Sequence, residues 1–331
     1  MGERVLEVSN LTTVFHTKKG TFPAVYGIDF TLDAGETLAI VGESGCGKSV
    51  TSLSIMHLLP DRIGEVAAGS SVKFKGTEIS GYNNKQMSKL RGDEISMVFQ
   101  DSLTSLNPTM TVMEQMVEPF MVHRGMKRSE AEKSAVEMLR KVGIPNPEIR
   151  ARQYPHQFSG GMRQRVIIAM ALSCNPSVLI CDEPTTALDV TIQAQILKMI
   201  YDLKKEMNTA VILITHDMGV VAETADRVLV MYGGQGVEQA DCETLFTDPL
   251  HPYTQGLLAS IPKIDDDTRL STIEGMVPGL GNMPAGCHFC DRCPYCTKRC
   301  REENPPMYQV EGREVRCFLY EEKDGGGQCE E

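Results

Sequence analysis

The sequence predicts an α/β fold that is interrupted by an all-helical insert and followed by a small cysteine-rich C-terminal domain. Three observations predict it. Apolar runs alternate with helical patterns up to about residue 233, a glycine-rich loop joins one run to a helix, and seven of the eleven cysteines lie between Cys287 and Cys329. Alternating strands and helices are typical of α/β layers. Thiols this dense in a cytosolic chain favour metal binding over disulfides.

The expected strands are short apolar runs bounded by turn residues. In chain order they are Val5–Val8, Tyr26–Leu32, Thr37–Val41, Ile95–Phe99, Val178–Cys181, Ala210–Thr215 and Arg227–Tyr232. Between Thr111 and Leu172 the pattern is helical, with one helix expected from a capping box at Ser129 to about Val142. A helix is also expected from Val190 to Met207, and another after the glycine-rich loop, ended by Pro60.

Regular alternation fades after about Gly233, and later segments differ in composition. Proline and glycine accumulate from Pro278 to Gly286 and predict a linker, while the acidic, glycine-rich residues 321–331 predict a disordered tail. We therefore expect one domain over 1–240, with the helical insert at about 101–172, and a second over 241–320.

Composition excludes several classes of protein. The 331 residues carry 33 Lys and Arg against 44 Asp and Glu, a net charge of −11, which argues against nucleic-acid binding because that depends on neutralising phosphates. The longest apolar run, Val166–Leu172, has seven residues, whereas a membrane-spanning helix needs about 20. The first residues show no secretory signal, so we expect a cytosolic chain.

Residues 42–49 match the G-x-x-x-x-G-K-[ST] phosphate-loop pattern between an expected strand and an expected helix. The glycines let backbone N–H groups point at a triphosphate, Lys48 is expected to reach the β and γ phosphates, and Ser49 to bind Mg²⁺. A helix N-terminus offers an anion about 0.3–1 kcal/mol, whereas a full charge at 4 Å is worth roughly 4 kcal/mol at an effective dielectric of 20. Lys48 and the metal therefore carry most of the attraction. The alternative is a glycine-rich turn with an incidental lysine.

Two acids, Asp182 and Glu183, end the apolar strand that starts at Val178. Parallel strands deliver their last side chains to the crevice where ligands bind, so Asp182 is expected to hold Mg²⁺ through its waters. Glu183 is expected to orient and deprotonate the attacking water. The alternative is that both acids only cap the next turn.

The segment Phe158-Ser159-Gly160-Gly161-Met162-Arg163-Gln164-Arg165 resembles the signature motif of ATP-binding cassette (ABC) proteins. With the phosphate loop, Gln100, the acidic strand, the Ala187-Leu188-Asp189 turn and His216, it makes six motifs in the family's order. The resemblance covers roughly residues 3–240 and implies a P-loop NTPase fold with a RecA-like core, an antiparallel β subdomain and a helical subdomain. Residues 159–165, the His251-Pro252-Tyr253-Thr254 segment and the cysteine tail more narrowly resemble the ATPase subunits of oligopeptide and dipeptide importers.

The resemblance also implies residue roles. Gln100 would contact Mg²⁺ and report nucleotide state to the helical insert, His216 would contact the γ-phosphate and help set the attacking water, and Asp189 would form the D-loop contact across a dimer interface. Phe15 is expected to stack on adenine, with Tyr26 and Phe22 as alternatives. The implied ATP-binding residues are Phe15, Gly42, Glu43, Ser44, Gly45, Cys46, Gly47, Lys48, Ser49, Val50 and Gln100.

Ser159, at a helix N-cap before two glycines, forms an anion seat. Family geometry implies that Ser159, Gly160, Gly161 and Met162 clasp the nucleotide of a second subunit, so that ATP holds a head-to-tail dimer together and hydrolysis loosens it. Met162 stands where the family usually has Gln, and a thioether cannot replace the hydrogen bonds of an amide. A homodimer and a heterodimer both satisfy this arrangement, and the importer resemblance favours a heterodimer with a homologous ATPase.

The resemblance further implies a peripheral protein on the cytoplasmic face of the membrane, energising solute import with two permease subunits and an extracytoplasmic peptide-binding protein. Residues of about 101–125, with Leu103 and Leu106 expected to be exposed, would contact the permease. Dipeptides, longer peptides and nickel complexes all stay open as solutes. An ATP-dependent machine on DNA or the ribosome is disfavoured by the acidic charge, and a sensor with a vestigial cassette by the intact catalytic residues.

Two sets of tail cysteines compete as metal ligands. Cys290, Cys293, Cys296 and Cys300 match the gaps of the bacterial ferredoxin run, except that Arg301 stands where that run has proline. The importer resemblance instead implies a [4Fe–4S] cluster on Cys287, Cys293, Cys300 and Cys317, with Cys290 and Cys296 as spare thiols. Zinc suits four thiolates equally well, and bare thiols are the third reading. The expected role is structural, since this tail is too small to build its own core.

Overall fold

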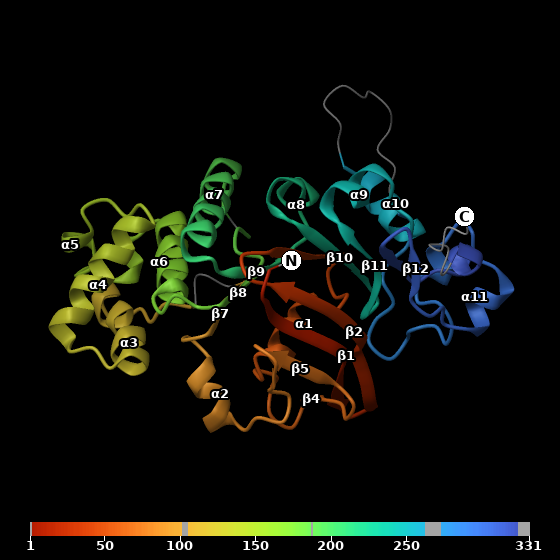
Figure 1. The fold of residues 1–331 in the computed structure, drawn as a ribbon, viewed down its shortest axis with the longest axis horizontal. Helices are drawn as coiled ribbons and strands as arrows, with labels where there is room; N and C mark the ends of the chain where they lie inside the picture. The colour runs from red at the N-terminus through yellow and green to blue at the C-terminus, as the bar shows by residue number, and fades with distance from the viewer. Residues whose placement is uncertain (1, 101–104, 187, 262–272, 324–331) are drawn as a thin grey trace. The chain divides into compact units, whose positions relative to one another are not determined.

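The computed structural model describes residues 2–100, 105–186, 188–261 and 273–323. The chain forms two compact units, whose elements are labelled in Figure 1. The first comprises residues up to 6, 32–36 and 81–213, and the second comprises 7–31, 37–80 and the residues from 214 onward. Within the described residues, no helix is both long enough and apolar enough to cross a membrane.

An antiparallel sheet built on two long N-terminal strands belongs mainly to the second unit. Its strands are β1 (Arg4–Thr17), β2 (Gly20–Asp33), β4 (Gly64–Val66), β5 (Ser71–Phe74) and β6 (Thr77–Glu78), in the order β2-β1-β5-β6 with β4 also paired to β1. The strands expected at Val5–Val8 and Tyr26–Leu32 lie inside β1 and β2 but are too short. Buried and part-exposed residues alternate along both strands, as in sheets with one solvated face, so an apolar run marks only part of each.

A second set of strands in this unit carries the phosphate loop. All five residues of β3 (Thr37–Val41) are buried, and β3 runs parallel to β10 (Arg227–Tyr232). Antiparallel pairs then join β10 to β11 (Gln235–Asp241), β11 to β13 (Arg313–Val315) and β13 to β12 (Tyr308–Val310). The helices of the unit are α1 (Lys48–Ile55), α8 (Met218–Thr224), α9 (Cys242–Thr247), α10 (Pro252–Ala259) and α11 (Lys298–Glu302).

Strand β11 continues the alternation beyond Gly233, where the sequence pattern was expected to fade. The turn at Gly233 and Gly234 has positive φ angles of 53° and 82°. β11 is buried along six of its seven residues although it contains Gln235, Glu238 and Gln239. Because these polar residues interrupt the apolar run, a search for apolar runs does not predict this strand.

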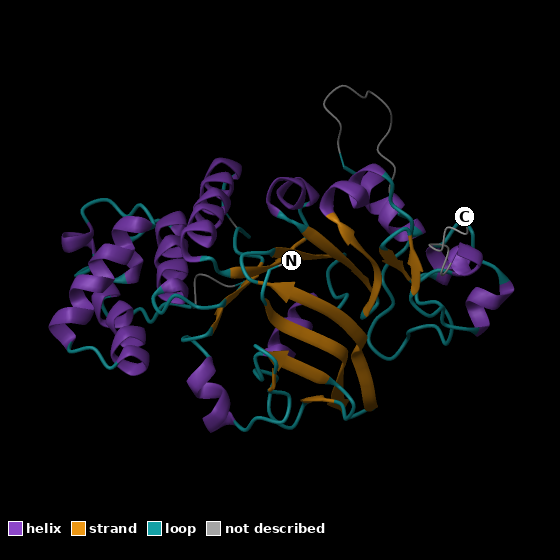
Figure 2. Cartoon of the chain, viewed as in Figure 1, coloured by secondary structure: helices purple, strands orange, loops and turns teal. Residues whose placement is uncertain are grey.

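The first unit contains the helical insert. Its helices are α2 (Asn84–Leu90), α3 (Val112–Arg124), α4 (Arg128–Lys141), α5 (Pro147–Arg150), α6 (Gly160–Leu172) and α7 (Val190–Met207), drawn in purple in Figure 2. α3 packs against α4 and α6. Strands β7 (Ile95–Val98) and β8 (Val178–Asp182) pair in parallel, and β9 (Ala210–Thr215) carries the chain from the first unit into the second.

Two predicted boundaries need correction or completion. α4 begins at Arg128, before the predicted cap Ser129, because the Glu130 carboxylate accepts the backbone N–H of Lys127. α1 ends at Ile55, well before Pro60. Residues 278–286 form neither helix nor strand, and their role as a linker remains a prediction. Of the expected acidic tail, residues 321–323 close a 3₁₀ helix (Phe318–Lys323) and 324–331 lie outside the described residues. The domain boundaries remain a prediction.

Candidate functional site

The phosphate loop lies between β3 and α1, as predicted. Gly42 directly follows the buried strand and has a φ of 149°. A Cβ atom there would lie 2.2 Å from the carbonyl oxygen of Met231, so the backbone can pass this point only as glycine. α1 starts at Lys48 and has no acidic residue in its first turn. The positive end of its dipole is therefore open to an anion.

Lys48 folds back over the loop. Its side chain is 5% exposed, and Nζ donates to the carbonyl oxygens of Gly42 at 2.7 Å and Glu43 at 3.0 Å. Nζ also lies 3.8 Å from Cys46 Sγ, and burial raises the pKa of that thiol. The buried ammonium thus has backbone oxygens as partners, which phosphate oxygens can replace.

In the first unit, parallel pairing of β7 with β8 brings two predicted residues together. Val98 pairs with Cys181, so the residues that follow both strands lie at the same edge of the sheet. There the Gln100 amide donates to the Glu183 carboxylate at 3.1 Å, and the Thr186 hydroxyl donates to the same oxygen at 2.8 Å. Asp182, at the end of β8, is 4% exposed.

Glu183 has an unusual backbone conformation. Its φ is 47°, in the left-handed region that residues other than glycine rarely occupy. Such conformations persist where the surroundings fix them and are enriched at functional sites. Here the turn is closed by the N–H of Thr186, which donates to the Glu183 carbonyl at 3.2 Å.

The predicted signature segment also lies in the first unit. Ser159 is the exposed N-cap of α6, and its hydroxyl accepts the N–H of Met162 at 3.3 Å. That hydroxyl retains its own proton for a further acceptor. Asp189 is the exposed N-cap of α7, and its side chain makes no cap hydrogen bond.

His216 and the candidate adenine-stacking aromatics lie in the second unit. His216 is exposed directly after β9, and the next residue, Asp217, caps α8 by accepting the N–H of Gly219 at 2.9 Å. Phe15 is half-buried in β1, opposite Gly64 of β4. Tyr26 packs edge-on against His288, with ring centroids 4.7 Å apart. The choice of stacking residue remains a prediction.

The expected permease-contact residues need correction. Leu106 was expected to be exposed, but it is 2% exposed. Its sequence neighbours Ser105 and Asn107 are polar, as is typical of a surface segment, yet the folded chain buries Leu106 itself. Leu103 lies outside the described residues. In the same segment, Met121 and Val122 of α3 are 41% and 68% exposed.

The tail cysteines line one small cavity of about 110 Å³. Its lining includes Cys287, Cys290, Cys293, Cys300 and Cys317, whereas Cys296 is not part of it. Burial and the neighbouring cysteines raise the pKa of Cys287 to about 12 and that of Cys317 to about 11. Among the described residues, no three His, Cys, Asp or Glu side chains converge closely enough to hold a single metal ion.

Sequence reasoning missed the contacts that hold Glu43 of the phosphate loop. The Glu43 carboxylate is bound by Arg292, and its backbone N–H donates to the hydroxyl of Tyr253. Both partners lie more than 200 positions away in sequence, so no local pattern could reveal them. The only signal was that both lie in segments already noted for the importer resemblance.

Comparisons with known proteins match both the nucleotide-binding part and the C-terminal region of this chain. The ABC transporter family model matches residues 25–186, and the model of the oligopeptide/dipeptide transporter C-terminal region matches residues 237–300. The chain is 53% identical to the oligopeptide transport ATP-binding protein AppD of Bacillus subtilis, covering 96% of this chain and 98% of AppD. It is 50% identical to the dipeptide transport ATP-binding protein DppD of the same organism, covering 97% and 96%.

Solved structures agree at the level of the fold. The dimeric ATP-binding cassette MJ0796 in a post-hydrolysis state with ADP and Pi matches with a TM-score of 0.64 and 28% identity, covering 72% of this chain and 98% of that one. The cbiO1 protein of Clostridium perfringens matches with a TM-score of 0.62 at 28% identity, covering 74% and 92%. The full-length similarity to peptide-transport ATP-binding proteins shows that this chain belongs to the ABC transporter family.

Proposed function

We propose that this chain is the ATP-hydrolysing subunit that energises import of di- or oligopeptides across the cytoplasmic membrane. The observation that carries the proposal is the end-to-end similarity to AppD and DppD, which spans both the nucleotide-binding part and the C-terminal region. Import of nickel complexes or other small solutes by the same motor is the alternative.

The residues of the chain divide the work of hydrolysis. Lys48 exchanges its loop carbonyls for the β and γ phosphates, and Glu183 orients the attacking water and accepts its proton. Gln100 holds the Glu183 carboxylate in position through its amide, and His216 contacts the γ-phosphate. Ser49, Gln100 and Asp182 offer oxygen donors of the kind that Mg²⁺ prefers. When bound, Mg²⁺ neutralises charge on the phosphates.

A second, homologous ATPase completes the motor. Ser159, Gly160, Gly161 and Met162 form the seat for the partner's nucleotide, and Asp189 crosses the interface. The similarity to a dimeric cassette supports this arrangement. Two permease subunits and an extracytoplasmic peptide-binding protein complete the importer, with this chain peripheral on the cytoplasmic face. Exposed Met121 and Val122 of α3 are the permease contacts we propose in place of Leu106.

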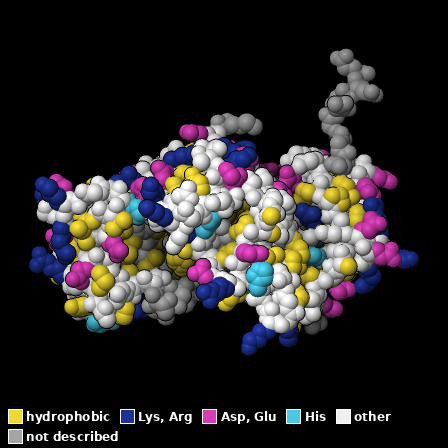
Figure 3. Space-filling view, turned by 90° about the horizontal axis from the view of Figure 1, so that it is seen from below, with side chains coloured by type: hydrophobic (Ala, Val, Ile, Leu, Met, Phe, Trp, Pro, Cys, Tyr) yellow, Lys and Arg dark blue, Asp and Glu magenta, His cyan; other side chains and the backbone are white. Residues whose placement is uncertain are grey.

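ATP-dependent action on nucleic acid is the less favoured function. The net charge is −11. Among the described residues of the face in Figure 3, basic and acidic side chains are interspersed. Phosphate backbones are bound by concentrated positive charge, which this mixture does not supply.

The cysteine cavity is proposed to hold a [4Fe–4S] cluster on Cys287, Cys293, Cys300 and Cys317. All four line the same cavity, which supports this set over the ferredoxin-like set containing Cys296. Zinc is the alternative occupant, because four thiolates suit it equally well. A cluster would supply a covalent tie between segments of the tail.

Replacement of Glu183 by Gln tests the proposed function. We expect E183Q to bind ATP but to hydrolyse it at least about 100-fold more slowly, because a general base is lost. In cells whose native copy carries E183Q, uptake of a labelled tripeptide should fall to background, while E132Q on α4, where the side chain is 43% exposed, leaves it intact. Unchanged tripeptide uptake together with lost nickel uptake would favour the alternative solute.

A further inference from the structure

Residues of the C-terminal region form hydrogen bonds with the phosphate loop. We propose that Arg292 and Tyr253 are positioning residues that fix Glu43, and through Glu43 set the loop for nucleotide. The inference rests on the proposed function, because it concerns the same nucleotide site. All of the residues involved lie in the second unit.

All three side-chain nitrogens of Arg292 make hydrogen bonds, and together these fix the orientation of its guanidinium group. Nη1 lies 3.0 Å from each carboxylate oxygen of Glu43, Nη2 donates to the carbonyl of Ile273 at 3.2 Å, and Nε donates to that of Glu274 at 2.9 Å. The guanidinium also lies over the ring of Tyr232. The Arg292 side chain is 6% exposed and that of Glu43 30%. This contact is therefore unlike an exposed ion pair, whose geometry is free to drift.

Tyr253 holds the backbone of the same residue. The Glu43 N–H donates to the Tyr253 hydroxyl at 2.9 Å, and Tyr253 is fully buried. Its ring packs edge-on against Tyr232 and Phe289, with centroids 4.7 and 5.4 Å away. Phe289 also lines the cysteine cavity. The aromatic cluster thus joins the cavity wall to the phosphate loop.

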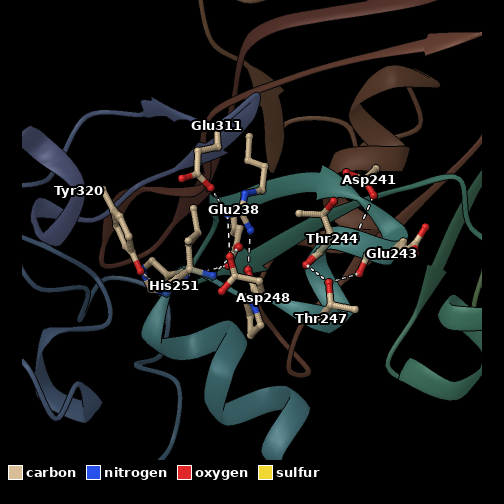
Figure 4. Close-up of polar contacts among 12 residues, drawn as sticks. Glu238, Asp241, Glu243, Thr244, Thr247, Asp248, His251, Glu311 and Tyr320 are labelled. Atoms are coloured by element: carbon tan, nitrogen blue, oxygen red, sulfur yellow. Dashed lines mark hydrogen bonds and ion pairs between the residues drawn. The ribbon is translucent and has the colours of Figure 1, made fainter. Parts of the chain in front are cut away.

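A buried carboxylate fixes the start of the helix that carries Tyr253. Glu238 of β11 accepts the N–H of Leu250 at 2.8 Å and that of His251 at 2.9 Å, and Figure 4 shows Glu238 and His251 side by side. His251 Nδ1 then accepts the N–H of Tyr253 at 3.0 Å. The direction of the Tyr253 side chain is therefore set by the C-terminal region itself.

A third contact reaches the far end of the loop. His288 Nδ1 lies 2.7 Å from the carbonyl oxygen of Gly233, and the N–H of Gly234 donates to the carbonyl of Cys46 at 3.0 Å. Both ends of the loop are thus tied to residues that follow β10. The position of Glu43 also affects Lys48, because Lys48 Nζ donates to the backbone carbonyl of Glu43.

The test measures binding of the N-methylanthraniloyl analogue of ATP, with Mg²⁺, to the purified full-length chain. R292Q is expected to raise the Kd about tenfold and Y253F about threefold, as loss of a charged and of a neutral hydrogen bond predicts. R292K should restore part of the loss. The double variant R292Q/E43Q should bind no more weakly than R292Q, because Arg292 acts through Glu43.

Arg313 provides the matched control. Its side chain is 4% exposed and its Nη2 pairs with Asp248 at 2.9 Å, so R313Q also removes a buried guanidinium from the C-terminal region. We expect R313Q to lower Tm and leave the Kd unchanged. Equal weakening by R313Q, or an unchanged Kd in R292Q, would overturn the inference while wild-type binding still upholds the proposed function. Failure of the wild-type chain to bind would instead overturn the proposed function, and this inference with it.

Discussion

At the scale of single residues, Gly42 shows how little freedom the phosphate loop has. A Cβ there would lie 2.2 Å from the Met231 carbonyl oxygen, a distance that only a backbone shift can relieve. At Gly45 the φ is also positive, at 80°, but a Cβ would meet nothing within 4 Å. A substitution at Gly42 would therefore cause a steric clash as well as backbone strain, whereas one at Gly45 would cause backbone strain alone.

Replacing each glycine by alanine tests this difference. G42A should displace the loop and abolish binding of ATP, whereas G45A should cost about 1–2 kcal/mol of stability for the left-handed backbone. Isothermal titration with ATP and thermal unfolding would measure both effects. Equal binding by G42A and G45A would contradict the close approach at Met231.

His251 predicts a pH dependence of stability. Burial lowers the pKa of its imidazole to about 3, from an ordinary value of 6.5. Between these values the unfolded chain binds more protons than the folded one, so the free energy of unfolding falls as pH drops, by up to about 1.4 kcal/mol per pH unit. H251N keeps a side-chain acceptor for the helix cap and should flatten this slope in denaturant titrations from pH 4 to 7. H156N, at an exposed site, should leave it unchanged.

At the scale of elements, α3 presents apolar side chains outward near its C-terminal end. Met121 and Val122 are exposed, while Met116, Val117 and Phe120 of the same helix are buried. Buried residues hold α3 in the first unit, so the exposed pair is available for a partner.

We expect the double substitution M121E/V122E to uncouple ATP hydrolysis from peptide uptake without lowering Tm. Tripeptide uptake in cells, compared with ATPase activity of the purified chain, would measure this. L106E, at a buried position, should instead destabilise the fold. Unaltered uptake in the double variant would refute the assignment of α3 to the permease contact.

The sequence predicts elements well where one signal dominates. β3, with five buried residues, and the phosphate loop were placed correctly because an apolar run and a glycine pattern suffice. β11 was missed because Glu238, which is fully buried, serves the neighbouring helix rather than solvent. The start of α4 was misplaced because Lys127, a poor cap by residue type, receives the side chain of Glu130. Long-range contacts such as Arg292 with Glu43 leave no local pattern.

At the scale of the whole molecule, the cysteine tail distinguishes this chain from a bare nucleotide-binding cassette. Solved cassettes at 28% identity cover 72–74% of the chain. The C-terminal region adds β12, β13 and the cysteine cavity. Its own apolar core is small, built on Leu250, Tyr308, Val310 and Val315, so an iron–sulfur cluster is the additional stabilising element we propose.

Serine substitutions test the cluster on the intact chain. C293S should lower iron and sulfide content and visible absorption of anaerobically purified protein, and should also lower Tm. C296S, outside the cavity lining, should retain both. A colourless wild-type protein with one bound zinc would overturn the [4Fe–4S] assignment.

The Arg292–Glu43 pair has a thermodynamic counterpart, because free-energy coupling between two sites is reciprocal. If the tail tightens the grip on ATP, then ATP must protect the tail to the same degree. Backbone amides around residues 273–293 should exchange with deuterium more slowly once nucleotide is added, because Arg292 joins this segment to Glu43 of the phosphate loop. Nucleotide binding would thereby also stabilise the cysteine-rich region against local unfolding.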